Sequence, residues 1–224
     1  MGLSSVVLGG LSAGITAVVA MSADAQMPGA PVLQSAWATP GAAVALDIAG
    51  GSDRTLVAAA GSWTPVRRLQ FTGGLGFQSG GAVGSGGAYG VRMAMPFGSP
   101  SSTFGFALFG GLGGGESRRR EFPRPAPDSV TNSSEIVVGG SLGWQHGLLS
   151  TRSLALSVAP AALFYQGGSE PGMLVRVAIG ADVSISESLG ITMGVDIGRN
   201  RPRGGGGPTG PQFGIGLTYA MNRR

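Results

Sequence analysis

The chain has 224 residues, of which 43 are glycine, and only 12% of its residues are charged. The formal net charge is +4, all 15 basic residues are arginine, and the absence of cysteine excludes disulfides, thiolate nucleophiles and thiolate metal sites. Glycine exceeds its usual share of about 7%, but no Gly-X-Y repeat accompanies it, which excludes a collagen-like fibre.

The first 25 residues have the pattern of a cleaved secretory signal. The stretch Val6–Ala20 is apolar or small, and it is followed by Ala23-Asp24-Ala25, a typical A-x-A cleavage site. We therefore predict a signal peptide at residues 1–25, a Pro- and Ala-rich leader at residues 26–40, and one domain at residues 41–224. The alternative for the apolar stretch is a buried helix of a soluble domain.

From residue 41 onward, bulky apolar residues alternate with small or polar residues. In the last run, Phe213, Ile215 and Leu217 alternate with Gly214 and Gly216. A period of two places the two sets on opposite faces of a β-strand. Bulky residues on one face and small ones on the other are typical of a closed barrel with lipid outside. The same alternation predicts ten strands, at residues 41–50, 54–63, 69–78, 88–97, 103–113, 135–145, 153–165, 172–183, 189–199 and 211–221.

The predicted strand lengths and connections fit an up-and-down transmembrane barrel. Spanning strands need about 9–11 residues, and no stretch after residue 26 has the ~20 continuous apolar residues that a spanning helix needs. Short and longer connections alternate along the chain, which is the layout of bacterial outer-membrane barrels. We predict an all-β, closed antiparallel barrel of ten strands. The alternative is eight strands, if the first two runs do not span.

Aromatic residues recur near the short connections of the predicted barrel. Trp63, Phe97, Trp144 and Tyr219 all lie toward the same ends of their strands. Rings at such a depth are typical of the membrane interface, where the apolar body meets lipid and a polar edge reaches water. We interpret these four residues as an interfacial girdle, with packing in a core as the alternative.

The strand pattern of residues 41–221 and the closing segment Phe213-Gly-Ile-Gly-Leu-Thr-Tyr-Ala-Met221 resemble small bacterial outer-membrane β-barrels, the OmpA/OmpX-like transmembrane domains. The resemblance implies a porin-like transmembrane barrel in the outer membrane of a Gram-negative envelope. It also implies contact with outer-membrane lipid, including lipopolysaccharide, and insertion by the barrel-assembly machinery. It leaves the oligomeric state open.

Five charged residues fall on the face that we expect to line the lumen. Isolated charges in a low-dielectric interior are costly, so these residues should pair with one another or meet water. Small barrels have interiors only wide enough for side chains, which favours a polar network that fills the lumen over a narrow pore. The five residues are Asp47, Arg92, Arg176, Asp182 and Asp196.

Arginines cluster in two of the predicted long loops. Guanidinium groups bind phosphate and carboxylate well, so these loops could contact the phosphates of lipopolysaccharide or another anionic surface. The alternative is a solvated loop in which Arg and Glu compensate each other locally. The candidate contact residues are Arg118, Arg119, Arg120, Arg199, Arg201 and Arg203.

The sequence offers little catalytic or cofactor chemistry. The single histidine, His146, lies at a predicted short turn, and we interpret it as an interfacial residue rather than a catalytic one. One histidine without cysteine makes a transition-metal cluster improbable. No cofactor or nucleic-acid partner is expected, because no phosphate loop or nucleic-acid motif is present.

We therefore expect a non-enzymatic outer-membrane barrel with a structural, adhesive or narrow-pore role. The alternatives are an outer-membrane lipid-modifying enzyme and a soluble periplasmic barrel that binds an apolar ligand. The soluble alternative requires the bulky apolar residues to line the interior.

Overall fold

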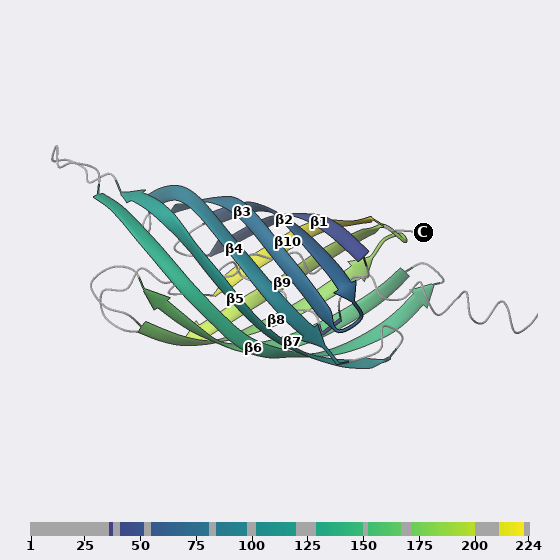
Figure 1. The fold of residues 1–224 in the computed structure, drawn as a ribbon. Helices are drawn as coiled ribbons and strands as arrows, with labels where there is room; N and C mark the ends of the chain where they lie inside the picture. The colour runs from purple at the N-terminus through teal and green to yellow at the C-terminus, as the bar shows by residue number, and fades with distance from the viewer. Residues whose placement is uncertain are drawn as a thin grey trace, which may run out of the picture.

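The computed structural model describes residues 36–37, 41–51, 55–80, 84–97, 102–119, 129–149, 152–166, 172–199 and 211–221. Every regular element in these ranges is a β-strand, and the strands run obliquely around one barrel (Figure 1). None of the described residues belongs to a helix that is long and apolar enough to cross a membrane. The strands are β1 (Gly41–Gly51), β2 (Thr55–Val66), β3 (Leu69–Gly80), β4 (Gly84–Pro96), β5 (Phe104–Arg119), β6 (Ser129–Leu149), β7 (Arg152–Gln166), β8 (Gly172–Ser184), β9 (Leu189–Arg199) and β10 (Gln212–Met221).

The sheet closes on itself. Each strand pairs antiparallel with its neighbours in the chain, and β1 pairs with β10 over ten residues, from Ala42 opposite Met221 to Gly51 opposite Gln212. The predicted ten-stranded closed antiparallel barrel is therefore confirmed, and the eight-stranded alternative is wrong. The weakest part of the sequence prediction, the first two runs, forms a regular hairpin in which Val44 faces Gly61.

The hairpin of β5 and β6 is longer than its apolar pattern indicates. The sequence placed residues 114–134 in a loop, but the segment from Gly113 to Arg119 pairs residue by residue with Ser129–Glu135. Polar residues continue a ladder as readily as apolar ones once two strands are in register. The prolines Pro123, Pro125 and Pro127, which cannot donate to a ladder, all fall between the two strands. The expected loop is therefore partly strand.

Alternation along each strand separates an outer face from a lumen face. In β2, for example, the even positions from Leu56 to Ser62 are buried, and the odd positions from Thr55 to Trp63 are exposed. The lumen side carries mostly Ala, Ser, Gly and Thr. The largest of its apolar clusters is formed by Ala94, Phe109, Val137, Ala159, Leu163, Leu174 and Ala178. The interior is thus filled mostly by small side chains and not by a conventional hydrophobic core.

Candidate functional site: the outer wall and the lumen

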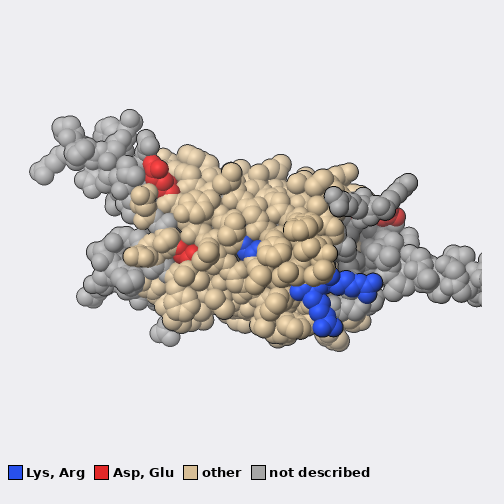
Figure 2. Space-filling model, in the orientation of Figure 1, with Lys and Arg blue, Asp and Glu red and all other residues tan. Residues whose placement is uncertain are grey.

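The outer wall carries a continuous belt of bulky apolar side chains. Leu46, Leu75 and Leu142 are each at least 60% exposed, and they represent a set drawn from all ten strands. No described residue on the outward positions of the strands is charged in the middle of this belt. On the face that Figure 2 presents, most of the visible charged side chains lie toward the two ends, with a small basic patch near the middle. The interpretation as a soluble barrel needed these residues inside, and the structure places them outside.

Aromatic side chains border the belt near the short connections. The rings of Trp63 and Phe71 stack at 6.3 Å between centroids, and those of Phe97 and Phe106 stack at 5.5 Å. Trp144 lies parallel to the imidazole of His146 at 5.8 Å. The four predicted girdle residues all lie on the outer face, Tyr219 included. The structure adds stacking partners across the sheet for Trp63 and Phe97, whereas the partner of Trp144 lies two residues along the same strand.

Further aromatic residues lie on the outer face toward the long connections. They occupy the halves of β3, β4, β7 and β10 that are nearer to those connections, and all are exposed. Two aromatic borders separated by an aliphatic band are the arrangement that lipid-spanning barrels adopt. The residues of this second border are Phe77, Tyr89, Phe164 and Phe213.

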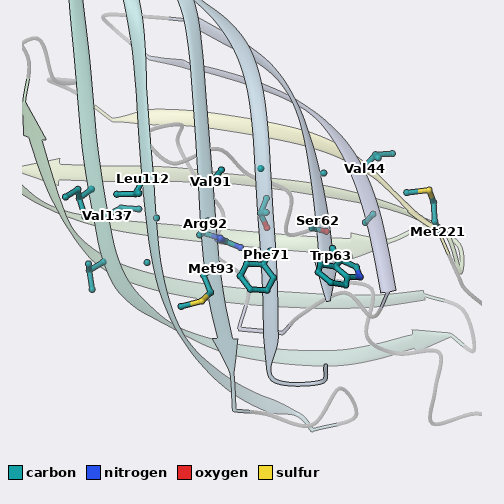
Figure 3. A pocket seen from close by; sticks show the side chains of 18 residues that line it. Val44, Ser62, Trp63, Phe71, Val91, Arg92, Met93, Leu112, Val137 and Met221 are labelled. Carbon is teal, nitrogen blue, oxygen red and sulfur yellow. The ribbon is translucent and has the colours of Figure 1, made fainter. Parts of the chain in front are cut away.

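A shallow groove of about 800 Å³ crosses the outer wall from β1 to β6 (Figure 3). Its sides are two rows of outward side chains, with Trp63 and Phe71 in one row and Val91 in the other. In the row of Val91, the outward glycines Gly61 and Gly73 pair with each other and carry no side chain, which hollows the wall there. The groove belongs to the apolar belt, and its lining also includes the buried lumen-face residues Ser62, Thr72 and Arg92.

The five predicted lumen charges all lie on the inward face, and the structure brings two of them together. Arg176 Nε donates to Asp196 Oδ2 at 2.7 Å, and both side chains are buried. Asp182 accepts a hydrogen bond of 2.7 Å from Thr192 Oγ1. The guanidinium of Arg92 lies 5.8 Å from the centre of the Phe109 ring, within cation–π range.

Two large inward side chains, Arg176 and Phe109, each face a glycine on an adjacent strand, whereas Asp182 and Asp196 do not. Arg176 pairs with Gly198, and a Cβ at that glycine would lie 3.0 Å from Arg176 Cγ. Phe109 pairs with Gly139 in the same manner, with Phe109 Cζ 2.5 Å from such a Cβ. The alternation alone predicts a lining of small residues, and the register shows that several inward glycines make room for one specific neighbour.

The same relation holds for the fifth charge. Asp47 pairs with Gly216 on β10, and a Cβ at Gly216 would meet the Oδ1 atom of Asp47. Asp47 lies on β1, and β10 and β9 separate it from Asp182 on β8. The lumen charges are thus distributed around the wall, with an ion pair in the β8–β9 sector.

Among the described residues, two buried ones, Ala36 and Trp37, come from outside the barrel strands. Trp37, which the sequence assigns to the leader, is 1% exposed and packs with Ala36 against Ala155 of β7. Its indole covers the paired glycines Gly105 and Gly143 of β5 and β6. No local signal in the sequence marks this contact, because Trp37 and Gly143 lie more than a hundred residues apart in the chain.

The predicted anionic-surface residues cannot be placed as a site. Arg118, Arg119 and Arg199 lie at the ends of β5 and β9 that lead into long connections, but their side chains lie outside the described part of the structure. Arg120, Arg201 and Arg203 lie outside the described residues altogether, as do the predicted signal peptide and most of the predicted leader.

No protein-family model matches the chain, and no curated protein sequence is significantly similar to it. Among solved structures, the chain is similar to the β domain of the Bordetella autotransporter BrkA, with 11% identity over 80% of this chain and 98% of that chain and a TM-score of 0.49. It is also similar to the N-terminal β-barrel domain of Pseudomonas aeruginosa OprF, with 8% identity over 80% of this chain and 95% of that chain and a TM-score of 0.44.

Proposed function

We propose that this protein is an exported, integral outer-membrane β-barrel with a non-enzymatic role, either structural or as a narrow pore. The observation that carries the proposal is the uncharged belt of exposed Leu, Ile, Val, Met and Phe around a closed sheet. Soluble proteins rarely expose contiguous apolar patches beyond a few hundred Å². A closed barrel leaves no strand edge unpaired in hydrocarbon, which is what a spanning sheet requires.

The lumen supports a narrow or blocked passage over a wide one. Arg176, Asp196 and Phe109 project inward from β8, β9 and β5, and Trp37 fills space between β5 and β7. Side chains that pair with one another across the wall occupy the volume that a permeating solute would need. We expect passage of small ions at most, and contact of the membrane-exposed groove with acyl chains.

The orientation follows from the alternation of connections. We propose that the short connections, with the Trp63, Phe97, Trp144 and Tyr219 girdle, face the periplasm and that the long ones face outward. In this orientation the arginine-rich segments reach the lipopolysaccharide layer. Export by the signal peptide and insertion by the barrel-assembly machinery belong to the same proposal.

Membrane partition tests the proposal directly. Expressed protein should fractionate with outer membranes, resist extraction by carbonate, and migrate faster on a gel before boiling than after it. Recovery in the soluble periplasmic fraction without detergent would contradict it.

A lipid-modifying activity is the competing function. His146 is the one imidazole in the chain, and its contact is the ring of Trp144 on the outer wall. Comparing the lipid A and phospholipid profiles of cells that express the protein with those of cells that express His146→Gln distinguishes the two. A change in acylation that disappears with His146→Gln would replace our proposal with an enzymatic one.

A further inference from the structure

The glycine pair Gly105–Gly143 forms a socket for the indole of Trp37 on the lumen side of β5 and β6. These glycines lie directly opposite each other in the ladder. A Cβ at Gly105 would lie 2.6 Å from Trp37 Cε2, closer than real Cβ atoms come to other atoms, and a Cβ at Gly143 would overlap the same ring. A pair of bare backbones therefore provides a flat surface that only glycine can offer to the indole.

The neighbourhood of the socket is fixed by polar contacts. Gln145, two residues beyond Gly143, is buried and donates through Nε2 to the carbonyl oxygen of Ser102 at 2.7 Å. The backbone N–H of Gln145 donates to the Thr103 carbonyl oxygen at 2.8 Å. These bonds hold the approach to β5 against the end of β6, which keeps the socket in shape at the short-connection mouth of the barrel.

Trp37 lies against the wall opposite the strand that it precedes. In the ring of ten strands, β6 is the fifth neighbour of β1 in either direction. Gly41 begins β1 with φ of +79°, a left-handed conformation that glycine adopts readily. Four residues of chain reach at most about 14 Å, so the link between Gly41 and Trp37 is short. The indole is thereby confined to the mouth of the lumen.

We propose that the pair Ala36–Trp37 is a built-in stopper, which closes the short-connection mouth of the lumen by seating the indole of Trp37 in the Gly105–Gly143 socket. Displacing the indole opens a path for ions along the lumen. The inference depends on the proposed membrane barrel, and it adds to it the element that controls the passage.

Fluorescence of a single tryptophan tests whether the indole of Trp37 occupies the Gly105–Gly143 socket. The protein has three tryptophans, so the double variant Trp63→Phe/Trp144→Phe reports Trp37 alone. In lipid vesicles, its emission should be blue-shifted and quenched weakly by both aqueous iodide and brominated lipid. Adding Gly143→Val to this protein should increase iodide quenching several-fold. Strong iodide quenching before that substitution, or none after it, would overturn the proposal.

Conductance tests the consequence. Full-length Trp37→Ala and Gly143→Val should each raise single-channel conductance in planar bilayers several-fold over the wild type, while Ile179→Ala, on the outer wall of β8, should leave it unchanged. Gel mobility before and after boiling verifies that each variant is folded, and Gly105→Ala serves as a milder socket variant if Gly143→Val does not fold. Unchanged conductance in folded Trp37→Ala would contradict a stopper.

A separate measurement isolates the membrane barrel itself. In Trp37→Phe, the remaining Trp63 and Trp144 should be quenched by brominated lipid, because both lie on the outer wall. Loss of that quenching would refute the membrane location. Normal quenching here, together with an accessible Trp37 in the other protein, would refute only the stopper.

Discussion

Two sectors of the lumen wall, β1–β2 and β8–β9, are built on the same alternation but are held in different ways. The β8–β9 sector carries the Arg176–Asp196 ion pair and the hydrogen bond between Thr192 and Asp182. The β1–β2 sector is lined mainly by buried alanines, including Ala45 and Ala60. The strand ladder supports both sectors equally, so their difference lies in the side chains. The polar sector depends on specific partners, and the alanine sector depends on volume.

The largest effect is expected when one partner of the ion pair is removed. Arg176→Met leaves the buried Asp196 carboxylate without its guanidinium, and breaking a buried pair in this way costs about 3–5 kcal/mol. We expect a loss of this order in the free energy of unfolding, measured by urea titration in lipid vesicles. The double variant Arg176→Met/Asp196→Leu should recover most of the loss. If Arg176→Met is as stable as the wild type, the Arg176–Asp196 pair is solvated as it would be in bulk water.

We propose that lipid covers the outer side of both sectors. A charge placed on the outer wall tests this. Val91 is exposed in the middle of β4, whereas Thr55 is exposed at the end of β2. Arginine at the midplane of a barrel costs about 2–4 kcal/mol, and about 0–1 kcal/mol near an interface. We expect Val91→Arg to reduce the free energy of unfolding by the larger amount and Thr55→Arg by the smaller. Equal, negligible effects would indicate that the wall faces water.

A smaller effect probes the second polar contact of the β8–β9 sector. Thr192→Val keeps the shape of the side chain but removes the hydroxyl that donates to Asp182. A hydrogen bond to a charged group contributes about 1.5–3 kcal/mol. The same unfolding titration should register this loss, and Thr192→Ser, which keeps the hydroxyl, should be closer to the wild type. If serine and valine behave alike, the contact contributes nothing specific.

The alanine sector should respond to added volume. Ala45 is 4% exposed and lies in a buried pair with Ala60. Ala45→Leu overfills this part of the wall, and overpacking costs about 1–3 kcal/mol. Ala45→Gly serves as the matched change in the opposite direction. A leucine that stabilises the protein would reveal unfilled space in the β1–β2 sector and would weaken the distinction between the sectors.

The parts of the fold that depend on local pattern were predictable from the sequence. Alternation is visible within a single strand, so the number of strands, the outer face and the inward position of Arg176 and Asp182 all followed from it. The length of β5 and β6 did not follow, because polar residues there pair in register without any apolar signal.

Contacts between distant parts of the chain were not predictable. The sequence does not indicate that Gly198 faces Arg176, or that Trp37 covers Gly105 and Gly143, since register is set by the closed sheet as a whole. The arginines of the long connections stay predictions, because their side chains lie outside the described residues.

The pairing of β1 with β10 has a consequence for biosynthesis. The ribosome makes β1 first and β10 last of the ten strands, yet Val44 must find Tyr219 before the ring is complete. Joining segments so far apart in the chain is entropically costly and slow. Until that final step, the first strand exposes an unsatisfied edge that invites aggregation. The edge of β1 is therefore satisfied only when the last strand of the ring has been made and has paired with it.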